Sequence, residues 1–141
     1  MKKIFVWLLL YTGIVATACS QKLNIPVAVN KAFSSKYPGA TNLKWGKENA
    51  KEYEAEFKLD GTTVSANFDS DGNWVETETV MKVADLPAVV TDAITKKYPG
   101  ASIIIAEKLE QPGNKVLFET TIKMKDKKKT VELNPDGTFA K

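Results

Sequence analysis

Three glutamates, Glu52, Glu54 and Glu56, have the residue type and spacing of a possible chemical site. They alternate with apolar residues, and this period of two predicts a half-buried strand with the three carboxylates on one face. Carboxylates two residues apart on a strand are about 6.5 to 7 Å apart, a separation that inverting glycosidases also use. The segment alone is therefore compatible with acid–base chemistry or with a solvated strand.

A second polar segment, Asp69-Ser70-Asp71-Gly72-Asn73, has the oxygen-rich composition of a calcium loop. An EF-hand loop beginning at Asp69 needs glycine at its sixth position and glutamate at its twelfth, where this chain has Trp74 and Val80. Asp-Gly is by itself a strong signal for a tight hairpin turn. We therefore predict a plain turn here, and we expect no metal and no cofactor.

The composition excludes several classes of function. The chain has no histidine, which removes Ser-His-Asp and Cys-His arrangements and the common zinc sites. All 20 basic residues are lysines, so the bidentate arginine contacts that read phosphate and guanine are missing. With 17 acidic residues the net charge is only +3, and we expect no nucleic-acid partner.

The N-terminus has the layout of a secretory signal peptide over residues 1–20. Lys2 and Lys3 precede an apolar run at 4–15, which is too short to span a bilayer and is followed by Ala16-Thr17-Ala18. Cys19, the single cysteine, stands where a bacterial lipoprotein carries its acylated residue, although the small residues before it also fit ordinary cleavage. We predict a periplasmic or secreted protein, with membrane anchoring through Cys19 as an open alternative.

The rest of the chain is duplicated. Lys36-Tyr37-Pro38-Gly39-Ala40 recurs 61 positions later as Lys97-Tyr98-Pro99-Gly100-Ala101, and Asp71-Gly72 recurs 65 positions later as Asp136-Gly137. One insertion of four residues near 111–114 reconciles the two offsets. A fixed period of this kind indicates a repeat architecture. We predict one domain over 21–141, made of repeats at about 24–83 and 85–141.

Each repeat is predicted to begin with a helix. Asn24 and Asp85 are the expected caps, each is followed two residues later by a proline suited to the first turn, and Pro-Gly ends each helix. Apolar residues at helical spacing form the buried stripe of each helix: Val29, Phe33 and Tyr37 in the first, and Val90, Ile94 and Tyr98 in the second.

Four strands are predicted after each helix, at 41–45, 52–59, 63–68 and 73–81, and again at 103–109, 116–124, 131–133 and 138–139, the last truncated by the end of the chain. Short turns between strands favour antiparallel pairing, and a sheet with one apolar face needs a single cover. The predicted fold is therefore α+β, with two tandem α-β-β-β-β repeats that form a continuous antiparallel sheet and place both helices on one face.

The other face of this sheet is then polar and open to solvent, and it is either a docking surface or merely hydrated. The counterparts of the three glutamates in the second repeat are Leu117, Glu119 and Thr121, so the carboxylate pattern is not repeated and a solvated face is favoured over catalysis. The candidate partner-binding residues are Glu52, Glu54, Glu56, Lys58, Ser65, Asn67, Glu119, Thr121 and Lys123, and the same face is expected to carry Thr63, Thr130 and Glu132.

Two helix-then-sheet units, each with a Pro-started helix, a Lys-Tyr-Pro-Gly-Ala stop and an Asp-Gly turn before an aromatic residue, resemble the PepSY-like, β-lactamase-inhibitor-like proteins of the Bacteroidota envelope. The resemblance covers essentially the whole chain after the signal peptide. It implies a curved antiparallel sheet, whose concave face grips the enzyme in β-lactamase inhibitors, and it brings no catalytic motif. No inhibitory residue of that family can be matched to a position of this chain.

The leading hypothesis is a non-catalytic secreted or envelope module that binds another protein through its polar sheet face, for example an enzyme that it inhibits. The alternative is a module that binds a small ligand or an envelope polymer in a groove between the repeats. A hydrolase is less favoured, because the sequence offers no pair of nucleophile and base.

Overall fold

The computed structural model describes residues 23–140, and the predicted signal peptide with Cys19 lies outside the described residues. No helix in this part of the chain combines the length and the apolar character needed to cross a membrane. The elements are α1 (Val27–Lys36), β1 (Thr41–Lys47), β2 (Glu52–Leu59), β3 (Thr62–Asp69), β4 (Trp74–Met81), the 3-10 turn η1 (Val83–Asp85), α2 (Ala88–Lys97), β5 (Ser102–Gln111), β6 (Lys115–Met124) and β7 (Lys127–Leu133).

The strands form one antiparallel sheet in the order of the chain, from β1 to β7. β4 of the first repeat pairs directly with β5 of the second, so the sheet runs through the junction without a break. The predicted α+β fold with a continuous antiparallel sheet is confirmed. The last predicted strand, at 138–139, is represented in the described residues by a single bridge between Leu133 and Phe139.

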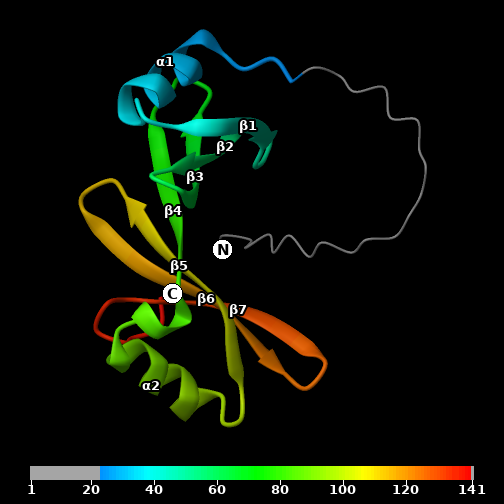
Figure 1. The fold of residues 1–141 in the computed structure, drawn as a ribbon, viewed down its shortest axis with the longest axis vertical. Helices are drawn as coiled ribbons and strands as arrows, with labels where there is room; N and C mark the ends of the chain where they lie inside the picture. The colour runs from blue at the N-terminus through cyan, green and yellow to red at the C-terminus, as the bar shows by residue number, and fades with distance from the viewer. Residues whose placement is uncertain (1–22, 141) are drawn as a thin grey trace, which may run out of the picture.

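Both helices pack on the same face of the sheet, as predicted. The residues Val64 of β3, Thr79 of β4, Lys108 of β5 and Phe118 of β6 are paired one after another across the sheet, so they all lie on this face. α1 and α2 lie over opposite ends of the twisted sheet (Figure 1). They close two separate cores, one around Val29 and Phe33 and the other around Val90 and Ile94.

The predicted helix caps are wrong, whereas the predicted helix ends are correct. Pro26 and Pro87 occupy the N-cap positions without a side-chain cap, because proline already has the backbone angle that leads into a helix. At the other end, the N–H of Tyr37 donates to the carbonyl of Phe33 at 2.9 Å, and the next residue, Pro38, cannot continue the helix.

The two Asp-Gly turns pack closely against the helices, Gly72 against α1 and Gly137 against α2. A Cβ on Gly72 would lie 2.7 Å from the Ala28 carbonyl oxygen, and a Cβ on Gly137 would lie 2.6 Å from that of Val89. Both glycines also have positive φ, which other residues adopt at a cost. These glycines therefore make the turn and permit its contact with the helix.

The segment considered for calcium is a turn closed by its own side chain. The carboxylate of Asp69 accepts hydrogen bonds from the backbone N–H groups of Asp71 and Asn73, each at 2.9 Å. Hydrogen bonds from the side chain and backbone of Asn73 lower the pKa of Asp69, because they favour the ionised form. The predicted turn is confirmed by the 3.0 Å bond from the Gly72 N–H to the Asp69 carbonyl.

Candidate functional site

The nine candidate residues lie on the sheet face opposite the helices, which we call the glutamate face. Glu54 pairs with Asn67 and Glu56 pairs with Ser65 between β2 and β3. Because side chains two residues apart on a strand share a face, these pairs fix the same side for the other candidates of these strands. Through β4 and β5 the pairing continues to Glu119, Thr121 and Lys123 on β6.

The structure adds three glutamates that the sequence analysis missed. Glu76 pairs with Asn67 and Glu78 pairs with Ser65, while Glu107 pairs with Glu119. Glu76 and Glu78 of β4 are hard to place from sequence. A bulge shifts the register between the pairs Asn67–Glu76 and Phe68–Trp74, so that Trp74 lies on the opposite face from Glu76, although simple alternation would put both on the same face. The signal that could have found them is the alternation of Glu76 and Glu78 with Thr77 and Thr79, read without Trp74.

Like charges stand directly opposite one another on this face. Glu107, Glu119 and Glu132 face each other across β5, β6 and β7. Such pairs destabilise a sheet. The ion pair found within residues 23–140 joins Lys108 to Glu110 at 3.0 Å and lies on the helix face, so it does not offset this repulsion.

Several carboxyl groups of the face hold protons unusually tightly. Burial first, and then the neighbouring carboxylates, raise the pKa of Glu78 to about 8 and that of Glu119 to about 7. Burial also raises the pKa values of Glu54 and Glu107, with help from neighbouring carboxylates at Glu54. The face therefore carries part of its carboxyl groups in the neutral form near pH 7 and can lose those protons when a positive charge arrives.

The middle of the glutamate face is not open to solvent, in contrast to the expectation from sequence. Asn67 is 4% exposed, and Leu109 and Leu117 are also buried on this side. Since both helices lie on the other side, we infer that the sheet bends toward the glutamate face. The buried Oδ1 atom of Asn67 has no hydrogen-bond partner, and its Nδ2 donates weakly to Glu76 at 3.5 Å.

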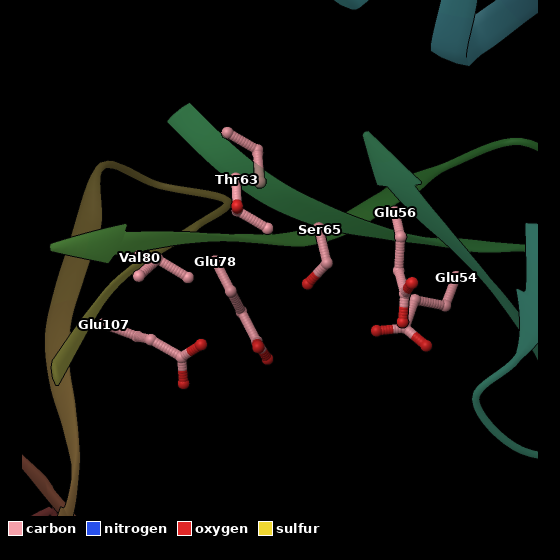
Figure 2. A pocket seen from close by; sticks show the side chains of 8 residues that line it. Glu54, Glu56, Thr63, Ser65, Glu78, Val80 and Glu107 are labelled. Carbon is pink, nitrogen blue, oxygen red and sulfur yellow. The ribbon is translucent and has the colours of Figure 1, made fainter. Parts of the chain in front are cut away.

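A hollow of about 180 Å³ lies on this face between β2 and β5. Figure 2 shows the side chains of Glu54, Glu56, Glu78 and Glu107 projecting from the same side of the strands around it. Thr63, Val64, Ser65 and Val80 form the rest of its wall, and Glu52 is not among its lining residues.

A carboxyl group with a pKa near 7 is suited to general acid–base catalysis as well as to binding. The hollow, however, is smaller than the roughly 300 to 1,000 Å³ of typical small-molecule sites. Within residues 23–140, no group of three or more His, Cys, Asp or Glu side chains is arranged to hold a metal ion. The arrangement is better suited to contact with one charged side chain of a larger partner than to enclosing a substrate.

A larger groove of about 700 Å³ lies between the repeats, beside the end of α1. Tyr37 and Trp74 line it from the first repeat, and Gln111, Lys115 and Val116 line it from the second. The groove expected from the sequence therefore exists, on the side of the sheet that carries the helices.

A family model described as "Putative beta-lactamase-inhibitor-like, PepSY-like" matches residues 17–62 and 51–134. Two matches along one chain fit the tandem repeat. No match is found among curated proteins.

Several solved structures similar to this chain come from Bacteroides species. A BLIP-like protein from Bacteroides fragilis is 27% identical with a TM-score of 0.72, and the match covers 86% of each chain. A protein from Bacteroides eggerthii, described as "putative periplasmic", is 20% identical with a TM-score of 0.75 over 84% of this chain and 87% of the other. A DUF2874 family protein from Bacteroides ovatus is 23% identical with a TM-score of 0.74 over 84% and 86%.

Proposed function

We propose that this chain, which belongs to the PepSY-like, beta-lactamase-inhibitor-like family, is a non-catalytic module of the cell envelope. In this proposal it binds another protein on its glutamate face. An envelope location agrees with the signal-like N-terminus and with the periplasmic description of the Bacteroides eggerthii relative. The observation that carries the proposal is the clustering of half-buried glutamates from both repeats on the sheet face that neither helix covers.

Folding alone does not account for this cluster. Neutral polar residues at the positions of Glu107, Glu119 and Glu132 would pair across the strands without repulsion. Groups that oppose folding in this way and have strongly perturbed pKa values are enriched at functional sites. A partner with complementary charge would convert the repulsion within the free protein into attraction across the interface.

The face also has the composition of a protein-binding surface. Val80 is 43% exposed and Ile105 is 45% exposed, and both stand among the glutamates. Apolar side chains surrounded by polar groups provide buried contact area, while the charges fix the orientation of the partner. The bending of the sheet inferred from buried Leu109 and Leu117 favours a convex partner.

The test is retention of partners from an envelope extract on immobilised protein. The double variant Glu54→Lys/Lys123→Glu exchanges charges on the glutamate face, and Asp92→Lys/Lys96→Glu exchanges charges on the exposed surface of α2 as a matched control. We expect the first variant to lose proteins that the parent and the control retain. Identical sets of retained proteins for all three would exclude docking on this face.

A second candidate function is supported by the groove between the repeats. Its volume of about 700 Å³ is within the range of small-molecule sites, and the rings of Tyr37 and Trp74 line it. This function predicts that a glycan or peptide from a panel raises the melting temperature, because a ligand at 100 times its Kd stabilises a protein by about 2.7 kcal/mol. Loss of that shift in Trp74→Ala, with the shift kept in Glu78→Gln, would assign the ligand to the groove.

A further inference from the structure

We propose that the hollow bounded by Glu54, Glu56, Glu78 and Glu107 receives the side chain of a lysine or arginine presented by the partner protein. This inference rests on the proposed function and specifies the chemistry of the partner. Three properties of the hollow support it, namely its charge, its apolar wall and its size, together with an unpartnered polar atom on the same face of the sheet.

The charge of the hollow is one-sided. Four carboxyl groups line it, and no lysine does. None of the four forms an ion pair within the part of the chain that the structure describes. A guanidinium or ammonium group placed among them would form charge-assisted hydrogen bonds, which are stronger than bonds between neutral groups.

An apolar wall adjoins the carboxylates. Val80 lines the hollow, pairs directly with Glu107 across β4 and β5, and remains 43% exposed. Ile105 lies two residues from Glu107 on the same face and is 45% exposed. Lysine and arginine have an aliphatic stem below a charged head, and this combination of an apolar wall and carboxylates matches both parts of such a side chain.

Asn67 supplies an observation that is independent of the acidic residues. Its Oδ1 atom is buried and accepts no hydrogen bond within residues 23–140. The residue lies between Glu54 on β2 and Glu76 on β4, and two positions along β3 from Ser65. Glu54 and Ser65 line the hollow, whereas Asn67 itself does not. A buried acceptor without a donor is rare in native proteins, so the polar groups of this face are not fully satisfied within the free protein.

The size of the hollow fits one side chain. Its volume of about 180 Å³ is below the range of typical small-molecule sites and holds the end of an extended residue. The surrounding bent face would then contact the rest of the partner, so that the cationic residue acts as a central anchor.

Binding of a cation is expected to release a proton. Burial and the neighbouring carboxylates raise the pKa of Glu78 to about 8, so its carboxyl group is mainly protonated at pH 7, and a positive charge beside it favours the ionised form. Affinity should therefore rise with pH from about 6 to 9. Besides Glu78, the charged and titratable groups on this side of the sheet are Lys44 on β1, Glu48 after it, Glu52, Glu54, Glu56 and Lys58 on β2, Asp69 on β3, Glu76 on β4, Glu107 on β5, Lys115, Glu119 and Lys123 on β6, and Lys128 and Glu132 on β7.

The experiment titrates the protein with acetylated, amidated tetralysine and tetra-arginine peptides, and with tetra(acetyl-lysine) as the uncharged control. Carboxyl-carbon NMR identifies the glutamates that respond, and calorimetry in two buffers of different ionisation enthalpy measures proton release. We expect the cationic peptides to shift Glu54, Glu78 and Glu107 and to release protons at pH 7. The comparison of the two cationic peptides shows which head group is preferred.

Two variants decide the outcome. Glu78→Gln and Glu107→Gln should each weaken tetralysine binding about tenfold, and Glu78→Gln should also reduce proton release. Glu110→Gln, which removes a carboxylate on the helix face, should leave both unchanged. Equal binding of the uncharged peptide, or equal affinity of all variants for the cationic ones, would overturn the inference.

The failure of this inference can be distinguished from failure of the proposed function. If the parent protein and Glu78→Gln retain the same envelope partner equally while Glu54→Lys/Lys123→Glu loses it, docking on the glutamate face stands and the cationic anchor is refuted. If the charge exchange on the glutamate face changes no partner, docking there is refuted as well.

Discussion

The first repeat fills its core with aromatic rings, whereas the second fills the equivalent space mainly with aliphatic side chains. Phe33 has ring neighbours at centroid distances of 5.1 Å for Phe57, 5.4 Å for Trp45 and 5.6 Å for Tyr37. Its counterpart Ile94 packs in a core with the aliphatic residues Leu86, Val90, Ile122, Val131 and Leu133.

The contacts that join helix to sheet are shared by both repeats. Lys36 lies 3.7 Å above the ring of Trp74, and Lys97 lies 3.6 Å above that of Phe139. The repeated pentapeptide thus supplies a cation over the aromatic residue that follows each Asp-Gly turn, in addition to the helix stop predicted from its sequence. The frame of the repeat is therefore duplicated, while the residues that fill its core and form its polar face differ.

The residues that form the glutamate face are among those that differ between the repeats. Glu107 corresponds to Gly46 by the offset of 61, so this carboxylate has no counterpart in the first repeat. The hollow lies near the junction of the repeats, because it combines Glu54, Glu56 and Glu78 of the first repeat with Glu107 of the second.

The largest expected effect separates the two cores. Phe33→Ala should lower the free energy of unfolding by about 3 to 5 kcal/mol, because it removes a buried ring from a cluster of aromatic rings. Ile94→Ala should cost less, about 2 to 4 kcal/mol. Urea denaturation followed by tryptophan fluorescence measures both, and an unchanged midpoint for Phe33→Ala would contradict the placement of α1.

The contact between turn and helix provides the second test. Gly72→Ala and Gly137→Ala should each destabilise the protein by about 2 to 3 kcal/mol, since the new methyl group meets a helix carbonyl and the backbone has positive φ. Gly61→Ala is the matched control, because its φ is +81° but nothing lies within 4 Å of the added atom, and it should cost about 1 kcal/mol. Equal losses for all three variants would show that the close approach to the helices has no energetic weight.

The third prediction concerns the junction and its dependence on pH. The pKa of Glu78 is higher in the folded protein, about 8, than its ordinary value of 4.5, so ionisation opposes folding and stability is lost as pH rises between these values. Glu78→Gln should therefore match the parent below about pH 4 and be more stable by roughly 2 kcal/mol at pH 8, after allowance for solvent screening. Thermal unfolding at several pH values checks this, and a constant difference between variant and parent would contradict it.

The smallest expected effect separates the two repeated tyrosines. The hydroxyl of Tyr37 is hydrogen-bonded to buried Thr77, which also accepts a 2.9 Å bond from the indole N–H of Trp74. Tyr98 instead accepts a 3.0 Å bond from exposed Lys129. Tyr37→Phe should cost about 1 kcal/mol and Tyr98→Phe only a few tenths. Chemical denaturation of both variants provides the measurement, and a larger loss for Tyr98→Phe would reverse the assignment.

Much of the fold could be predicted from the sequence because its signals are local. The Tyr-Pro-Gly stop ends each helix at the expected residue, and alternating residues such as those from Glu52 to Leu59 form a strand. The expected capping by Asn24 and Asp85 was wrong because the following prolines occupy the N-cap positions themselves. Capping depends on where the first helical turn begins, and the spacing of apolar residues fixes that position only approximately.

The sequence by itself determined the duplication, the α+β class and the side of the sheet on which the glutamates of β2 lie, because these properties depend on periods of two and of about 3.6 residues. Only the tertiary structure decided which carboxylates meet. The bulge after Asn67 sets the side on which Glu76 and Glu78 project, and the register between β4 and β5 across α2 brings Glu107 beside them. The raised pKa of Glu78 follows from its burial among these neighbours, which come from strands far apart in the chain.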